Sequence, residues 1–110
     1  MTEYRHASSH SIALEWDEAK RRTTLEVRGL DFADLAGYDW GATFDRENPR
    51  DYVGPDGERE TRRVSIGPLD GRLIVVAYTI RGTAVRVISM RKANAREQRA
   101  HDRREADDRR

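Results

Sequence analysis

Arginines are the residues of this chain whose type and spacing most suggest chemistry. The group of interest follows or interrupts short apolar segments in the second half of the sequence and consists of Arg63, Arg72, Arg81, Arg86 and Arg91, with Lys92 beside the last. A guanidinium group keeps its proton and binds a phosphate through two parallel hydrogen bonds. The group therefore favours a nucleic-acid partner. For any single member the alternative is a structural ion pair, which for Arg86 would involve Glu15, Asp17 or Asp45.

Metal-free cleavage of RNA is one reaction that such residues support. The 2′-hydroxyl attacks the adjacent phosphate, so the growing negative charge must be stabilised and protons must be moved. Arginines can stabilise the negative charge. His101 is our candidate for the proton transfer because histidine is the side chain that most often serves as a general acid or base, and the alternative is a solvated surface histidine. Lys20 and Glu60 are weaker acid–base candidates.

Several other classes of site find no support in the sequence. The chain has no cysteine, which excludes disulfides and thiolate metal sites and fits a reducing cytoplasm. His6 and His10 have helical spacing but lie in a polar leader, and no glycine-rich phosphate loop is present. We therefore expect no metal or cofactor. The longest apolar run, residues 73–78, is too short to span a membrane, and no signal peptide precedes it, so we expect a cytoplasmic protein.

Charge is distributed unevenly along the 110 residues. Residues 1–56 hold 7 Lys and Arg against 12 Asp and Glu, a balance of −5, whereas residues 57–110 hold 14 against 8, a balance of +6. The basic character therefore belongs to the segments that carry the arginine group. A domain of this size buries a modest fraction of its surface, so a partner that covers apolar surface would add stability.

The elements that must position these residues follow from local patterns. Alternating apolar residues predict a strand over residues 11–16, and Asp17 and Gly29 have the residue types of a helix N-cap and C-terminal stop. A second short helix is expected from Asp31, and a weak strand over residues 42–46. Trp16, between the first strand and helix, is expected to anchor the core and is a secondary candidate for the site.

Three stronger strands are predicted in the second half, at residues 59–67, 72–80 and 84–91. The connections between them are short enough for hairpins, which gives an antiparallel meander with the apolar middle strand at its centre. Simple alternation within the third strand places Arg86 on the same face as Ile88 and Met90, and Arg91 on the other face. A charged helix is expected from Asn94.

We therefore predict one α+β domain, in which two N-terminal helices pack on a small antiparallel meander sheet and a C-terminal helix follows. Residues 1–11 are expected to form a flexible leader, residues 12–101 the domain, and residues 102–110 a charged tail.

Fragments of the sequence resemble the BrnT toxins. The fragments span about Leu14 to His101 and include Glu-Trp-Asp-Glu-Ala-Lys at residues 15–20, Gly29 with Asp-Phe-Ala-Asp at 31–34, Ile-Gly at 66–67, Gly-Arg at 71–72, Val-Val-Ala-Tyr-Thr at 75–79, Val-Arg-Val-Ile-Ser-Met-Arg-Lys-Ala at 85–93 and Arg-Glu at 96–97. Members usually carry Lys-His-Gly where this chain has Val27, Arg28 and Gly29, and a tyrosine at the position of His101.

The resemblance implies a RelE-like fold and a metal-independent endoribonuclease toxin that inhibits translation. It also implies neutralisation by a BrnA-type antitoxin, whose ribbon-helix-helix part binds operator DNA, so that the toxin meets DNA only indirectly. Carried over to this sequence, Arg72, Arg81, Arg86 and Arg91 would contact the RNA phosphate and stabilise the transition state. Lys20 and Trp16 are secondary candidates on the same ground. The basic group itself adds Arg63 and Lys92 to Lys20 as residues expected to bind RNA.

Two other functions use the same sequence features. The first is a noncatalytic module that binds RNA or a protein partner through the arginine-rich sheet, with salt-sensitive affinity. The second is a structural subunit whose charged C-terminal helix docks on another protein. An Arg86→Ala variant separates a toxin from a structural subunit. A toxin would lose growth arrest while remaining folded, whereas a structural subunit would show a defect in folding or assembly.

Overall fold

The computed structural model describes residues 2–6, 13–38, 40, 44–45, 50–53, 57 and 59–108 of the chain. The elements follow in the order β1 (Thr2–His6), β2 (Ala13–Asp17), α1 (Glu18–Arg28), the 3-10 helix η1 (Phe32–Gly37), β3 (Phe44–Asp45), β4 (Arg50–Val53), β5 (Arg59–Leu69), β6 (Arg72–Arg81), β7 (Ala84–Lys92) and α2 (Ala95–Asp108). The fold is α+β, as the sequence predicted.

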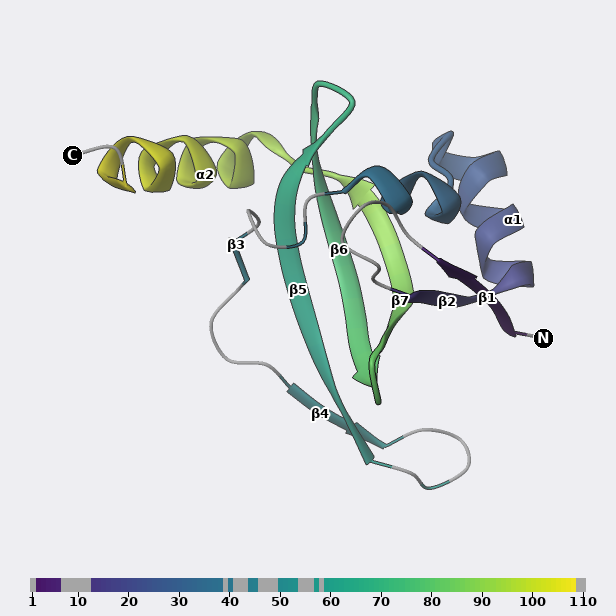
Figure 1. Ribbon diagram of the computed structural model, residues 1–110. Coiled ribbons are helices and arrows are strands. Elements are labelled where there is room, and N and C mark those ends of the chain that lie inside the picture. The colour runs from purple at the N-terminus through teal and green to yellow at the C-terminus, as the bar shows by residue number, and fades with distance from the viewer. Residues whose placement is uncertain are drawn as a thin grey trace.

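The predicted meander forms the centre of the sheet (Figure 1). β5, β6 and β7 pair antiparallel in sequence order, and β6 is the middle strand. The sheet is nonetheless mixed, with the order β1-β2-β7-β6-β5-β3, because β2 joins β7 in parallel and β4 pairs with β5. A purely antiparallel sheet was therefore the wrong prediction. The parallel step joins β2 to the last strand of the meander, so β5 and β6 lie between the two paired strands in the sequence.

The first helix begins and ends where its capping residues predict. Asp17 accepts hydrogen bonds from the backbone amides of Ala19 and Lys20, and Gly29 closes the helix with a left-handed φ of 68°. α1 itself has no buried residue. The predicted second helix is the short η1, which buries Phe32 and Leu35.

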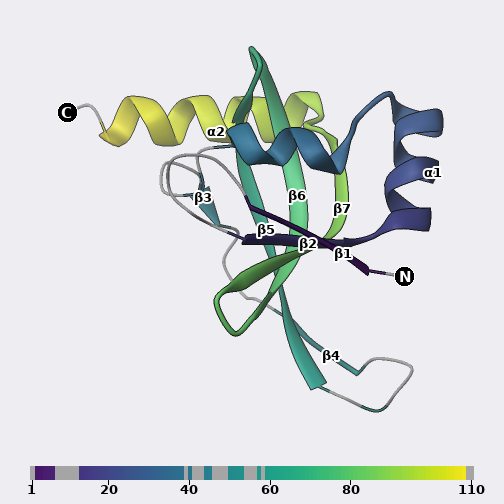
Figure 2. The same cartoon turned by 45° about the vertical axis from the view of Figure 1, so that its right-hand side comes forward.

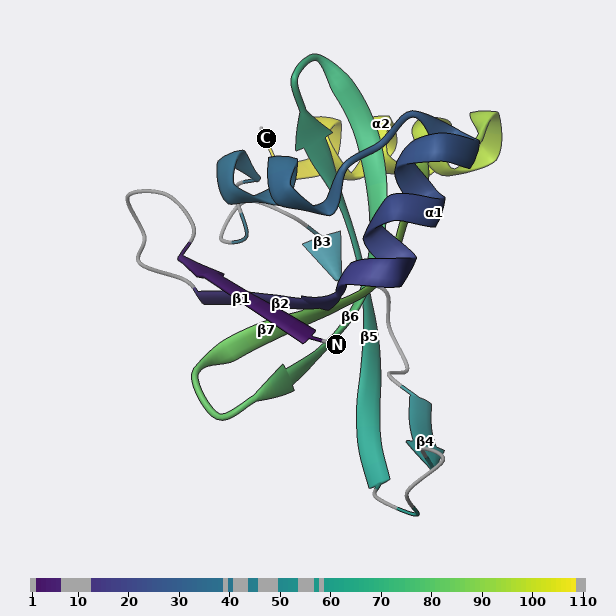
Figure 3. The same ribbon diagram turned by 90° about the vertical axis from the view of Figure 1, so that its right-hand side faces the viewer.

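Most of the core lies on one face of the sheet, beneath η1. The buried cluster consists of Leu14, Trp16, Leu30, Phe32, Leu35, Tyr38, Leu69, Ile74, Val76, Tyr78, Val87 and Met90. Trp16 is 1% exposed, which confirms its predicted place in the core. η1 crosses this face, whereas α2 lies on the opposite side of the sheet (Figures 2 and 3).

An irregularity in β7 changes which residues share a face. Ala77 pairs with Ser89 and the next residue, Tyr78, pairs with Val87, so Ile88 is an extra residue in β7. Such a β-bulge interrupts simple alternation. Arg86 consequently pairs with Thr79 and Arg91 with Val75, two positions four residues apart in β6 that share a face. The prediction that Arg86 and Arg91 lie on opposite faces was wrong.

The ends of the chain also differ from the sequence prediction. Thr2–His6, expected to belong to a flexible leader, form β1 and pair antiparallel with β2. The helix α2 continues to Asp108, through most of the segment expected to be a charged tail. The weak strand expected at residues 42–46 corresponds to β3, and only its residues 44 and 45 are described. No helix in the described part of the chain has the length and apolar character needed to cross a membrane.

Candidate nucleic-acid interface

Three of the predicted arginines share one face of the sheet. Arg81 and Arg86 lie near the β6–β7 hairpin, and Arg91 lies near the end of β7, where the chain turns into α2. The register places all three on the face opposite the main core, with Ser89 between Arg86 and Arg91. We call Arg81, Arg86 and Arg91 the arginine face.

Arg86 lies at the junction of the two parallel strands. Its Nη1 is 3.8 Å from Oε2 of Glu15, which is its register partner in β2. Both side chains are largely covered, with 20% and 23% of their surfaces exposed. Glu15 was one of the three carboxylates that the sequence offered for this pair. The contact holds the guanidinium near the sheet and leaves part of it open to a ligand.

A second carboxylate lies between two arginines at the same end of the sheet. Oε2 of Glu60 is 3.7 Å from Nη2 of Arg81, and Oε1 of Glu60 is 3.4 Å from Nε of Arg62. The Arg81 side chain is 48% exposed and so remains accessible. Arg62 was not among the residues predicted for the site. Its spacing of two from Glu60 on one strand was the available signal, because such residues share a face.

Arg91 makes the tightest ion pair of the arginine face. Its two terminal nitrogens lie 2.6 and 2.9 Å from the two carboxylate oxygens of Glu97, in the bidentate arrangement. This bond raises the pKa of the Arg91 guanidinium above its ordinary value. Glu97 also accepts a hydrogen bond from the Asn94 amide at 3.0 Å. The start of α2 is thereby attached to the arginine face.

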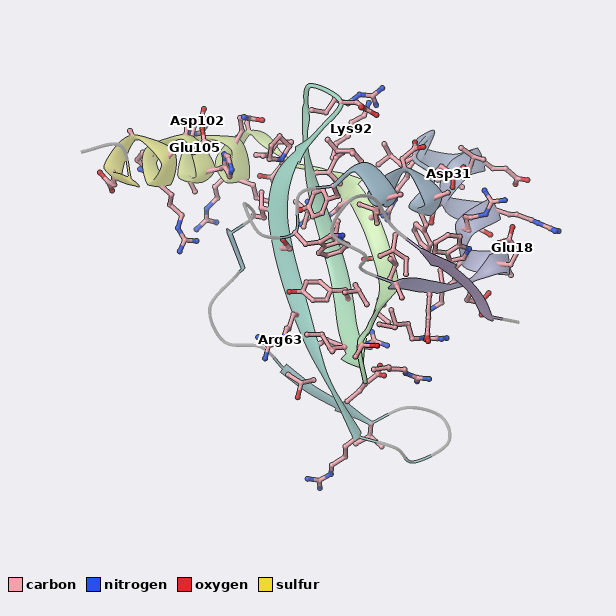
Figure 4. The ribbon with its side chains drawn as sticks, in the orientation of Figure 1. Glu18, Asp31, Arg63, Lys92, Asp102 and Glu105 are labelled. Carbon is pink, nitrogen blue, oxygen red and sulfur yellow. The ribbon has the colours of Figure 1, made fainter. Side chains whose placement is uncertain are left out.

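The remaining cations of the predicted group lie elsewhere. Arg63, Arg72 and Lys92 occupy register positions on the core face, opposite the arginine face. Arg63 and Lys92 are well separated along the sheet (Figure 4). Arg72 and Arg81 begin and end β6, about 30 Å apart for a strand of that length. The structure therefore does not bring Arg72 together with Arg81 around one phosphate.

His101 is buried on α2, with 6% of its surface exposed, and is not the solvated surface histidine that the sequence offered as an alternative. Its Nδ1 and Nε2 lie 4.0 Å from carboxylate oxygens of Asp102 and Glu105. Figure 4 places these two acidic residues on α2, far from the β6–β7 hairpin. His101 therefore lies on the helix that follows Arg91 and not beside the hairpin near which Arg81 and Arg86 lie.

Lys20 lies on α1, which runs beside β7 (Figure 1). Near the end of the same helix, Arg28 donates a hydrogen bond from Nη1 to the backbone oxygen of Met90 at 2.8 Å. Both cations line a hollow between α1 and β7. Arg28 thereby satisfies a carbonyl at the edge of β7.

The arrangement supports phosphate binding and charge stabilisation. Cations that carboxylates hold in place before a substrate arrives need little reorganisation when negative charge develops. Glu60 and Glu15 lie beside Arg81 and Arg86, respectively, and a carboxylate can accept a proton as a general base. Among the described residues no group of three His, Asp or Glu side chains has the geometry to hold a metal ion, and His10 lies outside those residues.

Comparison with known families identifies the chain's family. The model of a family described as "Ribonuclease toxin, BrnT, of type II toxin-antitoxin system" matches residues 16–97, which is more than half of the chain. The matched segment runs from the end of β2 to the Glu97 that binds Arg91. No curated protein and no solved structure gives a significant match.

Proposed function

Because the chain belongs to the BrnT family of ribonuclease toxins of type II toxin–antitoxin systems, we propose that it cleaves RNA at the arginine face without a metal ion and thereby inhibits translation. The observation that carries the proposal is the bulge at Ile88, which aligns Arg86 and Arg91 on one face. Without the extra residue, simple alternation would separate these two cations.

In the proposed reaction the arginines act on the phosphate and a carboxylate acts on the proton. Arg81 and Arg86 stabilise the charge that develops on the phosphate oxygens when the 2′-hydroxyl attacks. Glu60, which lies beside Arg62 and Arg81, accepts the proton of that hydroxyl. As the 2′-oxygen bonds to phosphorus, the bond from phosphorus to the 5′-oxygen breaks, which leaves a 2′,3′-cyclic phosphate, and the departing 5′-oxygen takes a proton from water. Arg91 binds a neighbouring phosphate. We do not assign His101 to RNA contact or proton transfer, because its side chain is buried on α2.

We further propose that the protein partner is an antitoxin of the BrnA type, with a ribbon-helix-helix part that binds operator DNA. The family supports an antitoxin partner in general terms. We also expect a RelE-like arrangement, for which the support is the antiparallel meander between η1 and α2. The protein would work in the cytoplasm, where its RNA substrates and antitoxin are found.

The test is induced expression in a bacterial host, with growth and bulk translation as the readout. We expect arrest with the native protein and a loss of arrest with an Arg86→Ala, Arg91→Ala double variant. Arg96→Ala, Arg99→Ala is the matched control, because it removes the same charge from two exposed residues of α2. Thermal unfolding by circular dichroism must show that both variants are folded.

Cleavage by the purified protein tests the chemistry directly. We expect a single-stranded RNA to be cut at an unchanged rate in excess EDTA, with products that carry a cyclic or 3′ phosphate, since the 2′-hydroxyl attacks. Salt-sensitive RNA binding without cleavage, together with absent growth arrest, would instead establish a noncatalytic binding module.

A further inference from the structure

A hollow lies between α1 and the edge of β7 and is separate from the ion pairs of the arginine face. Its volume is about 360 Å³, and its lining consists of Ala19, Lys20, Thr23, Thr24, Val27, Arg28, Ile88 and Ser89. The hollow exists because β2 pairs with β7 only from Ala84 to Arg86, so that α1 lies beside the later part of this edge.

The polar part of the lining is cationic. Lys20 is exposed, and none of the described carboxylates forms an ion pair with it. Arg28 is held by its hydrogen bond to the Met90 carbonyl, which needs only one of its five N–H donors. The hydroxyls of Thr23, Thr24 and Ser89 complete the set of groups that can bind an anion or a sugar.

The apolar part of the lining suits a flat ring. Ile88 is half-buried, while Val27 on the rim is 75% exposed, so an apolar side chain faces solvent at the mouth of a cationic hollow. A volume of this size is at the lower end of ordinary small-molecule sites and accommodates one nucleotide, not a folded peptide element. Cations together with an apolar wall are the combination that recognises a phosphate and a base.

The bulge of β7 connects the hollow with the arginine face. Ser89 lines the hollow and also lies on the arginine face, opposite Ala77 and between Arg86 and Arg91. A strand of RNA that crosses the arginine face at Ser89 would therefore place its next nucleotide beside α1.

We propose that the hollow between α1 and β7 binds one nucleotide of the RNA, with its phosphate on Lys20 and Arg28 and its base against Val27 and Ile88. This inference rests on the proposed function and names a subsite for that RNA. Lys20 and Arg28 are binding residues in it and take no part in proton transfer.

The absence of cysteine from the chain allows a direct test of occupancy. A Val27→Cys variant carries a single thiol at the rim of the hollow. A Glu26→Cys variant carries one at the preceding position of α1, which is exposed and outside the lining. Alkylation by iodoacetamide is followed with and without saturating 2′-O-methyl RNA, which cannot be cleaved. We expect RNA to slow alkylation of the Val27→Cys thiol by about fivefold or more, as a buried contact requires, and that of the Glu26→Cys thiol less than twofold.

A charge-matched pair of variants measures the phosphate contact. Lys20→Gln is expected to weaken binding of the same RNA by about tenfold and to lower the slope of log affinity against log salt by about one. Arg22→Gln removes one charge from the exposed side of α1, 73% exposed, and should change the affinity less than twofold.

The outcomes separate this inference from the proposed function. RNA that binds without protecting the Val27→Cys thiol, or that loses equal affinity in both glutamine variants, overturns the subsite and leaves the nuclease standing. RNA that does not bind at all overturns both. Protection by the antitoxin and not by RNA would assign the hollow to protein docking and overturn the nucleotide subsite.

Discussion

Each arginine of the arginine face has a carboxylate beside it. Glu15, Glu60 and Glu97 lie between 2.6 and 3.8 Å from Arg86, Arg81 and Arg91, respectively. The Arg81 and Arg91 side chains are 48% and 39% exposed, and ion pairs of such exposed side chains contribute little to folding, typically below about 1 kcal/mol each. Their main consequence is geometric, because they fix long side chains that would otherwise lose rotamer freedom when the substrate binds.

Glu18 provides a residue-scale prediction about pH. Its carboxylate accepts hydrogen bonds from Arg21 and from the indole of Trp16 at 3.0 Å, and these bonds lower its pKa from 4.5 to about 2. A carboxyl whose pKa is lower in the folded state stabilises the fold above pH 4.5 and loses this contribution as the pH falls toward 2. We therefore expect Glu18→Gln to lower the melting temperature near neutral pH and to have little effect near pH 2.

The control for this prediction is Glu26→Gln, which removes an exposed carboxylate from the same helix. Its melting temperature should follow the native protein at each pH, as measured by circular dichroism. A gap between Glu18→Gln and the native protein that stays constant down to pH 2 would contradict the assigned role of the ionised carboxylate.

The start of α2 links secondary structure to the arginine face. Asn94 Oδ1 accepts a hydrogen bond from the Glu97 amide at 2.8 Å while the Glu97 side chain accepts one from the Asn94 amide, which is the reciprocal capping-box arrangement. The same carboxylate binds Arg91. Glu97 therefore caps the first turn of α2 and also binds Arg91. Loss of the cap would consequently disturb the position of Arg91 on the arginine face.

Asn94→Ala tests this link at the scale of the element. Loss of an N-cap costs about 1 kcal/mol, so we expect amide hydrogen exchange in the first turn of α2 to accelerate by roughly fivefold. RNA cleavage should fall as well, because Arg91 loses a rigid partner. Gln98→Ala, an exposed change in the same helix, should leave both exchange in that turn and cleavage near native values. Exchange that is unchanged in Asn94→Ala would refute the capping role.

Stability at the scale of the whole molecule depends on a small number of residues in η1. The longer helix α1 buries nothing, whereas η1 inserts Phe32 and Leu35, both 0% exposed, into the core face of the sheet. Tyr38 follows and directs its hydroxyl to the Ser65 hydroxyl at 3.3 Å. The core is therefore closed by six residues of 3-10 helix and the residue that follows them.

Leu35→Ala is expected to lower the free energy of unfolding by about 2–5 kcal/mol, because it leaves a cavity at the centre of this contact. That loss is a large fraction of the stability of an ordinary small domain. Val27→Ala, at an exposed apolar position of α1, should change the free energy by less than about 0.5 kcal/mol. Urea denaturation measures both, and equal effects would show that η1 does not close the core.

Local chemistry in the sequence determined much of this protein. Asp17 and Gly29 specify the two ends of α1 because capping involves only neighbouring residues. The meander was predictable for the same reason, since short connections with Gly71 and Gly82 in left-handed conformations join strands that are adjacent in sequence. The fragments between Leu14 and His101 also sufficed to identify the family, which the family model confirms over residues 16–97.

Only the tertiary structure decided which residues face the same way. The bulge at Ile88 places Arg86 and Arg91 together, and the parallel pairing of β2 with β7 places Glu15 beside Arg86. The first arrangement depends on one extra residue in a strand, and the second depends on the register between two segments that are distant in sequence. In either case a shift of one residue would move a side chain to the other face of the sheet. The burial of His101 likewise follows from where α2 lies, because a helix with so few apolar residues contains no local signal of the side it buries.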